Sequence, residues 1–492
     1  MLITENGETL TFKEFRDRSE SVAAGLAARG ISSETKVTWQ LPTCVPAVIA
    51  SAALARLGAV QSPVLHLYRE KELGFVMAHT GAEFVLVPGE WKGFDYAAMA
   101  SKLAADMDPS PTVLTFDDLT DGDPSTLPPV EVFADGEEPV RWIYSTSGTT
   151  SDPKGVLHTD GTLLAGGRGL ADALEMTSAD VGSMAFPYAH IAGPDYLLMV
   201  LLTGMSVVLV EAFLPAQAVE TYARLGVTMA GGSTAFYQMF VAEQRKQPGE
   251  PIIPSLRALS GGGAPMPPEI YREVLDEIGV KTCHGYGMTE IPMITQGAPS
   301  DSDEQLANTV GKPVTGAEIR IVTEDGEIVG IGVDGEVQVK GPMVAKGYTN
   351  PELTEAAFSD GYFRTGDVGH IRPDGHVVLT GRLKDIIIRK GENISAKEVE
   401  DLLYAHPLVG DVAVIGLPDR ERGERVCAVV EPPESGDAIT FEEMVAYLGE
   451  KGLTKFKTPE QLEVVETLPR NETLRKVLKY KLRDEFADKP WP

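Results

Sequence analysis

A hydroxyl-rich loop at residues 144–155 constrains the fold of this chain more than any other stretch. It reads Tyr-Ser-Thr-Ser-Gly-Thr-Thr-Ser-Asp-Pro-Lys-Gly and follows the apolar run 140–144, which predicts a buried strand. Gly148 lets the backbone approach an anion closely, and consecutive backbone N–H groups can form an anion-binding nest. The hydroxyl groups add donors, and Lys154 adds positive charge. The loop is therefore predicted to bind a polyphosphate.

Two other interpretations compete with polyphosphate binding. A cluster of Ser, Thr and Gly is most often an ordinary surface turn. The Walker loop of phosphoryl-transfer enzymes requires Gly directly before its lysine and Ser or Thr directly after it. Here Pro153 precedes Lys154 and Gly155 follows it, so the Walker interpretation fails.

The length and charge of the chain limit the classes of protein to which it can belong. At 492 residues it is too long for one simple core and predicts two to four subdomains. A formal net charge of −29 argues against nucleic-acid partners, which require clustered Lys and Arg. The same charge means that any nucleotide site has to create its own local positive potential.

The cysteines and the apolar runs bear on the cellular compartment. Cys44, Cys283 and Cys427 are far apart and lack CxxC spacing, which argues against a zinc site or a disulfide framework and fits a reducing compartment. The first residues lack a basic start and an apolar core, so no signal peptide is predicted. The apolar run 44–60 is interrupted by Pro, Arg and Gly and falls short of a membrane span. We therefore expect a cytoplasmic protein.

The first part of the chain alternates between predicted strands and helices. An Asn-Gly hairpin signal at 4–9 precedes a helix at 12–29, which a Thr11–Glu14 capping box begins and Gly30 ends. The alternation predicts a parallel sheet covered by helices on both faces, and a second α/β layer. The expected strands are 37–41, 59–64 and 84–87; the expected helices are 46–57, 70–79, 161–174, 215–225 and 234–244; 197–209 is apolar, and 106–139 is a long surface excursion.

Beyond residue 318 the pattern changes twice. Short strands with frequent glycine, at 319–322, 335–340 and 376–380, predict a small β-barrel-like subdomain. A helix at 395–406, strands at 412–417 and 426–430 and a helix at 440–450 then predict a small α+β domain. The expected architecture is α/β, with a large N-terminal domain at 1–382, a connection at 383–385 and a small C-terminal domain at 386–492.

The loop is one of six motifs that together resemble those of the adenylate-forming superfamily, which contains acyl-CoA synthetases, firefly-type luciferases and peptide-synthetase adenylation domains. The motifs occur in the family's order and cover almost the whole chain. One departure is Ser151, where the family usually has Gly, and we expect a slightly stiffer loop from it. The other motifs are Pro-Tyr-Ala-His-Ile-Ala-Gly at 187–193, Ser-Gly-Gly-Gly-Ala-Pro at 260–265, His-Gly-Tyr-Gly-Met-Thr-Glu at 284–290, Phe-Arg-Thr-Gly-Asp at 363–367 with Gly-Arg at 381–382, and the segment 468–479.

The resemblance implies roles for particular residues. Tyr286 would stack on adenine, Asp367 and Arg382 would reach the ribose, and Glu290 would bind Mg²⁺ through a hard oxygen ligand. The catalytic residues implied are Lys476, His190, Thr289 and Glu290, with His190 as a gate between the acyl pocket and the phosphates and Thr289 as a donor to the α-phosphate. The ATP-binding residues implied are Thr146, Ser147, Gly148, Thr149, Thr150, Lys154, Gly262, Gly263, Ala264, Gly285, Tyr286, Gly287, Asp367 and Arg382.

The C-terminal motifs carry further implied roles. Lys384 matches the hinge about which the lid swivels, and Lys390 with Gly391 matches the loop that lines the pantetheine channel for CoA. The terminal motif departs from the family, which has Gly directly before its lysine, because one additional residue is present here. Reading back from 477–483 identifies Lys476 as that lysine, whereas reading forward from Pro469 identifies Arg475. We favour Lys476, because the downstream match is longer.

The resemblance implies an AMP-forming acyl-CoA synthetase that uses ATP, Mg²⁺ and CoA. We expect small-molecule partners, no nucleic acid and no membrane span, and leave a homodimer open. Apolar segments at 229–233, 261–264 and 291–293 suggest a hydrophobic acid of medium-chain, alicyclic or steroid-side-chain type, although Asp195 lies near the position that holds the ammonium in amino-acid activators. Two alternatives stay open, namely a stand-alone adenylating enzyme that loads a carrier protein and a nucleotide-binding homologue without turnover.

Overall fold

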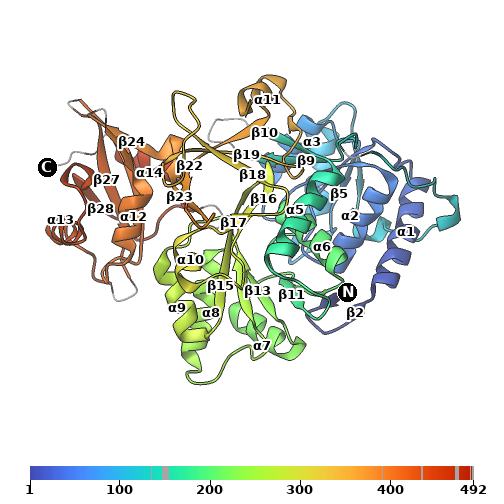
Figure 1. The fold of residues 1–492 in the computed structure, drawn as a ribbon. Helices are drawn as coiled ribbons and strands as arrows, with labels where there is room; N and C mark the ends of the chain where they lie inside the picture. The colour runs from blue at the N-terminus through green and yellow to red at the C-terminus, as the bar shows by residue number, and fades with distance from the viewer. Residues whose placement is uncertain are drawn as a thin grey trace.

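Two large sheets with helices on their faces form most of the molecule in the computed structural model (Figure 1). The structure describes residues 1–134, 136–146, 154–390, 392–420, 422–433, 436–470, 476–487 and 489, except for the side chains of residues 392 and 393. The first sheet has the order β20-β10-β9-β4-β3-β5-β8, in which the strands from β9 to β8 are parallel. Its strands are β3 (Lys36–Trp39), β4 (Val60–Pro63), β5 (Phe84–Leu86), β8 (Thr112–Leu114), β9 (Trp142–Thr146), β10 (Lys154–His158) and β20 (Gly347–Tyr348).

The second sheet has the order β17-β16-β15-β14-β13-β11-β12-β1-β2. Its central strands are parallel, and antiparallel hairpins close both edges. The strands are β1 (Leu2–Thr4), β2 (Thr9–Leu10), β11 (Val181–Met184), β12 (Ser206–Leu209), β13 (Met229–Gly232), β14 (Ala258–Gly261), β15 (Lys281–Met288), β16 (Ile291–Gln296) and β17 (Lys312–Pro313). A small ribbon joins β6 (Glu90–Trp91) to β7 (Phe94–Asp95).

Helices cover both faces of both sheets, as the buried clusters show. Val207 and Val208 are neighbours in β12 but belong to different clusters, because successive strand residues point to opposite faces. The Val207 cluster joins the two sheets through α1, α2, α5 and α6, the Val208 cluster packs under α7, α8 and α9, and a third cluster packs under α3 and α4. The helices are α1 (Phe12–Ala28), α2 (Val45–Leu57), α3 (Glu70–Thr80), α4 (Tyr96–Ala105), α5 (Asp160–Ala173), α6 (Ala192–Thr203), α7 (Pro215–Leu225), α8 (Thr234–Lys246), α9 (Pro268–Ile278) and α10 (Asp303–Asn308).

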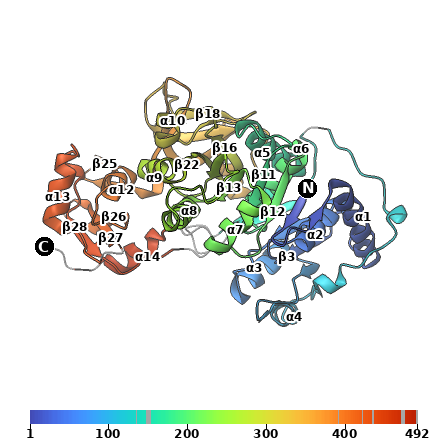
Figure 2. The same cartoon turned by 90° about the horizontal axis from the view of Figure 1, so that it is seen from below.

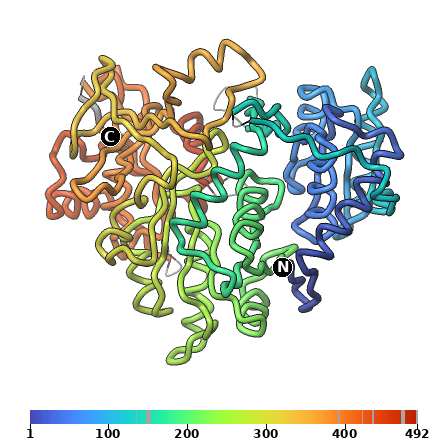
Figure 3. The backbone as a smooth tube through the Cα atoms, turned by 45° about the vertical axis from the view of Figure 1, so that its right-hand side comes forward, coloured from blue at the N-terminus to red at the C-terminus, as the bar shows by residue number. Residues whose placement is uncertain are grey.

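Two smaller sheets follow in the chain. An antiparallel sheet β18-β19-β22-β21, with β23 paired to β22, packs on the N-terminal core, and a sheet β25-β24-β27-β26, with β28 beside β27, forms the C-terminal part. The C-terminal elements gather at one end of the molecule and α1–α4 at the other (Figures 2 and 3). The elements are β18 (Glu318–Val322), β19 (Gly335–Lys340), α11 (Pro351–Ala357), β21 (Phe358–Ser359), β22 (Tyr362–Ile371), β23 (Val377–Arg382), β24 (Ile386–Arg389), β25 (Glu392–Ser395), α12 (Ala396–Tyr404), β26 (Asp411–Asp419), β27 (Gly423–Glu431), α13 (Phe441–Glu450), β28 (Gln461–Val464) and α14 (Lys479–Phe486).

The expected α/β class is confirmed, and local signals placed many elements correctly. The Thr11–Glu14 capping box begins α1, and α7 runs between Pro215 and a left-handed Gly226, as the sequence predicts. The excursion at 106–139 differs from the prediction, because β8 within it pairs with β5 and extends the first sheet. The apolar run 197–209 divides into the end of α6 and strand β12. Among the described residues, no helix has both the length and the apolarity that crossing a bilayer requires.

One buried carboxyl predicts a pH-dependent stability. Asp195 in α6 is 2% exposed, its Oδ1 has no hydrogen-bond partner among the described residues, and burial raises its pKa well above the usual value. The folded chain therefore keeps a proton that the unfolded chain releases above about pH 3.9, so stability falls with rising pH by about 1.4 kcal/mol per unit of pKa shift. We expect Asp195→Asn to raise the Tm more at pH 8 than at pH 5. The control Asp360→Asn, at an exposed turn, should show no such difference; an equal gain at both pH values would contradict the interpretation.

Candidate active site

The predicted phosphate loop connects β9 to β10. These strands form an antiparallel pair in which Thr146 lies opposite Lys154, so the loop leaves and re-enters the first sheet at one point. Lys154 extends over the ring of Tyr348, with Nζ 5.1 Å from the ring centroid. The predicted ligands Ser147, Gly148, Thr149 and Thr150, and the departure at Ser151, lie outside the described residues.

Thr289 and Glu290 are the two turn residues between β15 and β16. The pairing of Met288 with Ile291 fixes the turn, and Glu290 is 9% exposed. The Tyr348 hydroxyl donates to Oε1 of Glu290 at 2.7 Å, and the Ala345 N–H donates to the Glu290 carbonyl at 2.8 Å. Both the side chain and the backbone of Glu290 are therefore held by the segment that carries β20.

A buried histidine holds the other turn residue. His158 of β10 places Nε2 2.8 Å from the Thr289 carbonyl oxygen, which can only accept. Burial lowers the pKa of His158 to about 4, so the ring is neutral at pH 7 and carries its proton on Nε2. His158 thus ties the first sheet, next to the phosphate loop, to the Thr289–Glu290 turn of the second.

The Gly262–Ala264 segment forms a backbone wall beside β15. The Gly262 N–H donates to the Gly232 carbonyl at 3.0 Å, and a Cβ on Gly262 would lie 2.7 Å from the Gly285 carbonyl oxygen. Gly263 has φ +81°, which favours glycine. His284 donates from Nε2 to the Ala264 carbonyl at 2.8 Å. The wall therefore requires small residues and has a buried histidine behind it.

The two glycines that flank Tyr286, Gly285 and Gly287, lie close against β16. In the structure a side chain at Gly285 would collide with Gln296, and one at Gly287 would collide with the Pro292 carbonyl. Protein atoms occupy both spaces, so these glycines serve the close packing of the β15–β16 hairpin.

Tyr286, Asp367 and Arg382 form one hydrogen-bonded group. The Tyr286 hydroxyl donates to Oδ2 of Asp367 at 2.5 Å, and Nε of Arg382 lies 2.7 Å from Oδ1. Asp367 and Arg382 are direct partners in the pairing of β22 with β23. Burial, followed by the charge of Asp367, raises the pKa of Tyr286 well above its usual value. The group therefore joins β15 of the second sheet to the β22–β23 hairpin.

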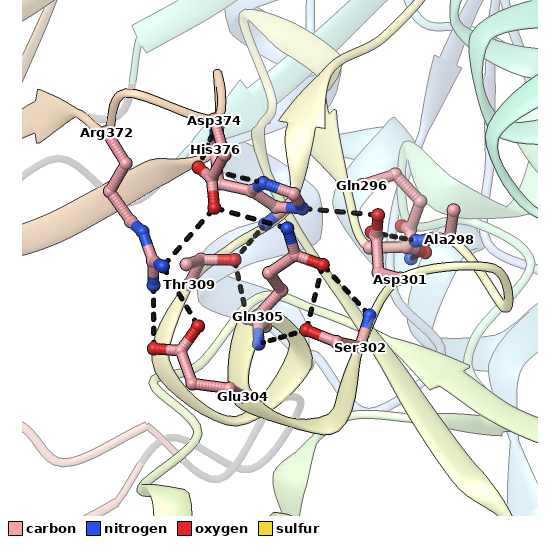
Figure 4. Close-up of polar contacts among 12 residues, drawn as sticks. Gln296, Ala298, Asp301, Ser302, Glu304, Gln305, Thr309, Arg372, Asp374 and His376 are labelled. Carbon is pink, nitrogen blue, oxygen red and sulfur yellow. Dashed lines mark hydrogen bonds and ion pairs between the residues drawn. The ribbon is translucent and has the colours of Figure 1, made fainter.

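A second polar network anchors the hairpin that carries Asp367 and Arg382 (Figure 4). Arg372 pairs with Glu304 of α10 at 2.9 Å and with Asp374 at 3.2 Å. The buried His376 lies between Asp374 and Asp301, with nitrogen–oxygen distances of 3.1 and 3.2 Å. This network fixes the far end of the β22–β23 hairpin to the segment that follows β16.

Comparison with known proteins identifies the arrangement. The AMP-binding enzyme family matches residues 1–349, and its C-terminal domain matches residues 398–474. The chain belongs to the AMP-binding enzyme family. It is an AMP-forming acid–thiol ligase of the acyl-CoA synthetase branch of the adenylate-forming superfamily.

Relatives of this AMP-binding enzyme differ in the acids that their names state. The chain is 30% identical to the medium-chain fatty-acid–CoA ligase of Escherichia coli K12, over 99% of this chain and 87% of that one. It is 33% identical to the salicyl-AMP ligase/salicyl-S-ArCP synthetase of Mycobacterium tuberculosis H37Rv, over 94% of this chain and 82% of that one. The crystal structure of ATP-bound MatB from Rhodopseudomonas palustris matches with a TM-score of 0.87 and 30% identity, over 99% of this chain and 95% of that one.

Lys476 of this AMP-binding enzyme interacts electrostatically with the Asp367–Arg382 pair. Burial first, and then the charge of Arg382, lower the pKa of Lys476 to about 8, with Asp367 acting in the opposite direction. Burial and the charge of Lys476 in turn lower the pKa of His190 to about 4. Lys476 therefore lies within electrostatic reach of the Asp367–Arg382 pair and of His190, while Arg475 falls outside the described residues.

His190 of the AMP-binding enzyme is held by hydrogen bonds just before the N-terminus of α6. Its Nδ1 accepts the Ala192 N–H at 3.2 Å, and its carbonyl accepts the Gly193 N–H at 2.7 Å. The neutral ring therefore carries its proton on Nε2, which gives it one donor for a ligand.

The predicted CoA-binding and hinge residues lie at the C-terminal sheet or just before it in the chain. Lys384 lies in a short turn between β23 and β24. Lys390 is exposed at the end of β24, with φ +51° and its N–H donating to the Arg422 carbonyl at 2.7 Å. Gly391 lies outside the described residues. Lys390 thus belongs to the C-terminal sheet and is separate from the strands that carry Asp367 and Arg382.

Sequence reasoning missed three residues of this site, His158, His284 and Tyr348. Their contacts join positions 131, 20 and 58 residues apart, so no local pattern reveals these contacts, although His284 is the first residue of the motif at 284–290. Tyr348 lies beside the phosphate loop because β20 pairs with β10, and the sequence carries no local signal for that pairing.

Proposed function

We propose that this AMP-binding enzyme converts a hydrophobic carboxylic acid to its CoA thioester, with ATP cleaved to AMP and pyrophosphate. One observation carries the proposal: Lys476, from the C-terminal part, lies within electrostatic reach of Asp367 and Arg382. Asp367 accepts a hydrogen bond from Tyr286 and forms an ion pair with Arg382. A polar group that can hold a nucleoside and a lysine ammonium from the C-terminal part lie near each other. This arrangement suits transfer of the AMP group of ATP to an acid.

In the first step a carboxylate oxygen of the acid attacks the α-phosphorus of ATP. The bond from that phosphorus to the bridging oxygen breaks, and pyrophosphate leaves. Negative charge shifts between phosphate oxygens, so preorganised cations and N–H donors are the main requirement. We assign this role to Lys476, Lys154, Thr289 and the loop residues Thr146, Ser147, Gly148, Thr149 and Thr150. Tyr286, Asp367 and Arg382 would hold the nucleoside, and Gly262, Gly263, Ala264, Gly285 and Gly287 would form its walls.

Glu290 has the chemistry of a Mg²⁺ ligand. Oε1 accepts from Tyr348, whereas Oε2 accepts no hydrogen bond among the described residues. Mg²⁺ is usually held by one or two carboxylates and by substrate phosphates, so one available carboxylate oxygen beside a phosphate loop fits the ion. Bound there with ATP, Mg²⁺ would neutralise charge that develops on the departing phosphates.

In the second step the CoA thiol attacks the acyl carbon and releases AMP. One arrangement of the active site cannot suit both adenylation and attack by the thiol. We therefore propose that the C-terminal domain is a hinged lid that moves between the two steps. We propose the domain division 1–382, 383–385 and 386–492, with Lys384 at the hinge and Lys390 and Gly391 lining the thiol channel after rotation. His190 would separate the acyl pocket from the phosphates.

The state of Asp195 supports a non-amino acid substrate. Its carboxyl packs against Gly166 of α5, where a side chain at Gly166 would collide with it. Burial raises the pKa of Asp195, so the neutral acid is favoured, and a neutral carboxyl is a weak partner for an ammonium group. Met229 and Ile291 are buried apolar residues of the expected pocket segments. We propose an acid of medium-chain, alicyclic or steroid-side-chain type.

A second candidate function is the loading of a carrier protein. The similarity to the salicyl-S-ArCP synthetase favours it, since that protein matches over most of its length. The acceptor would then be a protein-bound phosphopantetheine thiol, and the adenylation step would be unchanged.

A panel of acids with ATP and Mg²⁺ tests the proposal. We expect pyrophosphate release with medium-chain, alicyclic or steroid-side-chain acids, and acyl-CoA in the mass spectrum when CoA is added. Aryl acids and amino acids should be weak substrates. Acylation of a phosphopantetheinylated carrier protein without acyl-CoA formation would favour the second candidate function, carrier-protein loading. Turnover of amino acids alone would contradict the proposed substrate class.

A further inference from the structure

Tyr348 lies between two groups to which the proposed function gives separate roles. Its hydroxyl donates to Oε1 of Glu290 at 2.7 Å, and its ring lies under the ammonium of Lys154, with Nζ 5.1 Å from the centroid. The side chain is 7% exposed.

The backbone of Tyr348 is fixed on both sides. Tyr348 pairs with Val156 in the antiparallel register of β20 with β10, two residues from Lys154. Its N–H donates to the Thr354 hydroxyl at 2.9 Å. The neighbouring Gly347 has φ +123°, and a side chain there would collide with Thr354. The ring therefore has little freedom to leave its position.

We propose that Tyr348 is a positioning residue for adenylation, which orients the Glu290 carboxylate and the Lys154 ammonium with respect to one another. A hydrogen bond to an ionised carboxylate is stronger than one between neutral groups, so it selects one orientation of the carboxylate. Oε1 is then occupied and Oε2 is presented as a ligand. The inference rests on the proposed function for the roles of Glu290 and Lys154.

The aromatic face has a separate effect on Lys154. A cation over an aromatic ring is attracted by the negative potential of the ring face. The ring thus holds the ammonium at the start of β10, where the phosphate loop ends, without neutralising its charge as a carboxylate would. Removal of the hydroxyl and removal of the ring are therefore expected to have different consequences.

Two substitutions separate these effects. Tyr348→Phe keeps the ring and removes the donor, whereas Tyr348→Leu removes both. We expect Tyr348→Phe to weaken Mn²⁺ binding to the enzyme–ATP complex about tenfold or more, measured by electron paramagnetic resonance of free Mn²⁺, because loss of a group that orients a metal ligand typically costs 10–100-fold in affinity. Metal-free ATP affinity should be unchanged in Tyr348→Phe and reduced in Tyr348→Leu.

The chain offers a matched control in Tyr362. Its hydroxyl donates to Glu318, and its ring faces the guanidinium of Arg320, with the Cζ atom 4.1 Å from the centroid. Tyr362→Phe therefore loses the same kind of contact at an exposed place in the β18–β22 sheet. We expect it to leave Mn²⁺ affinity, ATP affinity and pyrophosphate release unchanged.

The outcomes are distinct. Equal Mn²⁺ affinity in wild type and Tyr348→Phe would overturn the inference and leave the proposed function intact. Equal losses in Tyr348→Phe and Tyr362→Phe would also overturn it. If wild-type protein with ATP retains no Mn²⁺, the metal assignment and the inference both fail. If Tyr348→Phe does not fold, Thr354→Val is the variant to test, because it removes the hydroxyl that fixes the Tyr348 backbone. An unchanged Mn²⁺ affinity in Thr354→Val would then overturn the inference.

Discussion

Lys476→Ala is expected to lower the adenylation rate by about a hundredfold or more, which is the usual effect of removing one group that stabilises transition-state charge. The structure places this ammonium within electrostatic reach of Asp367, Arg382 and His190. The measurement is acid-dependent pyrophosphate release without CoA, which isolates the first step.

The control is Arg475→Ala, because the terminal motif can be aligned in two ways. We expect this variant to retain most of the adenylation rate. A large loss in Arg475→Ala together with a small loss in Lys476→Ala would reverse the assignment of the catalytic lysine.

The pH profile gives the Lys476 assignment an independent signature. Burial lowers the pKa of Lys476 to about 8, so the ammonium is lost as the pH rises through that value. The value of kcat/KM for ATP, which reports groups of the free enzyme, should therefore fall above about pH 8. Lys476→Arg keeps its charge at higher pH, and its residual activity should not show this fall. A wild-type profile that stays flat to pH 9.5 would contradict the assignment.

Glu290→Gln is expected to produce the second large effect, a loss of about a hundredfold in adenylation with weaker binding of the divalent cation. The amide is close in shape to the carboxylate but lacks its charge, and Tyr348 can still donate to the amide oxygen. Raised Mg²⁺ concentration should restore part of the activity. The measurement is pyrophosphate release as a function of Mg²⁺ at saturating ATP.

Glu318→Gln is the matched control for this substitution. Glu318 also accepts from a tyrosine hydroxyl, that of Tyr362, but lies in the β18–β22 sheet. We expect wild-type Mg²⁺ dependence in this variant. Equal Mg²⁺ dependence in Glu290→Gln and wild type would rule out Glu290 as the ligand.

The sequence predicted the fold well wherever the signals were local. The Thr11–Glu14 capping box and the helix expected at 215–225, which is α7, are determined by residues within a few positions of one another. Strand β8 was missed, because three residues in a Pro- and Asp-rich stretch carry little periodicity and gain strand structure only by pairing with β5.

The candidate site was predictable to the extent that family motifs carry it. Tyr286 was named from one motif and Asp367 and Arg382 from another, and the structure joins them by a hydrogen bond and an ion pair. The residues that hold these motifs in place could not be found this way. Tyr348 and His158 act on Glu290 and Thr289 across sheets, and such contacts follow from strand register, which the sequence does not state.

The exchange of labelled pyrophosphate into ATP tests the central claim most directly, because it requires only that an acid form its adenylate reversibly. With Mg²⁺ and a suitable hydrophobic acid, and with no thiol present, the wild-type protein should incorporate label, and incorporation should stop when the acid is omitted. Absence of acid-dependent exchange across a broad set of acids would show that this chain does not activate carboxylates through AMP.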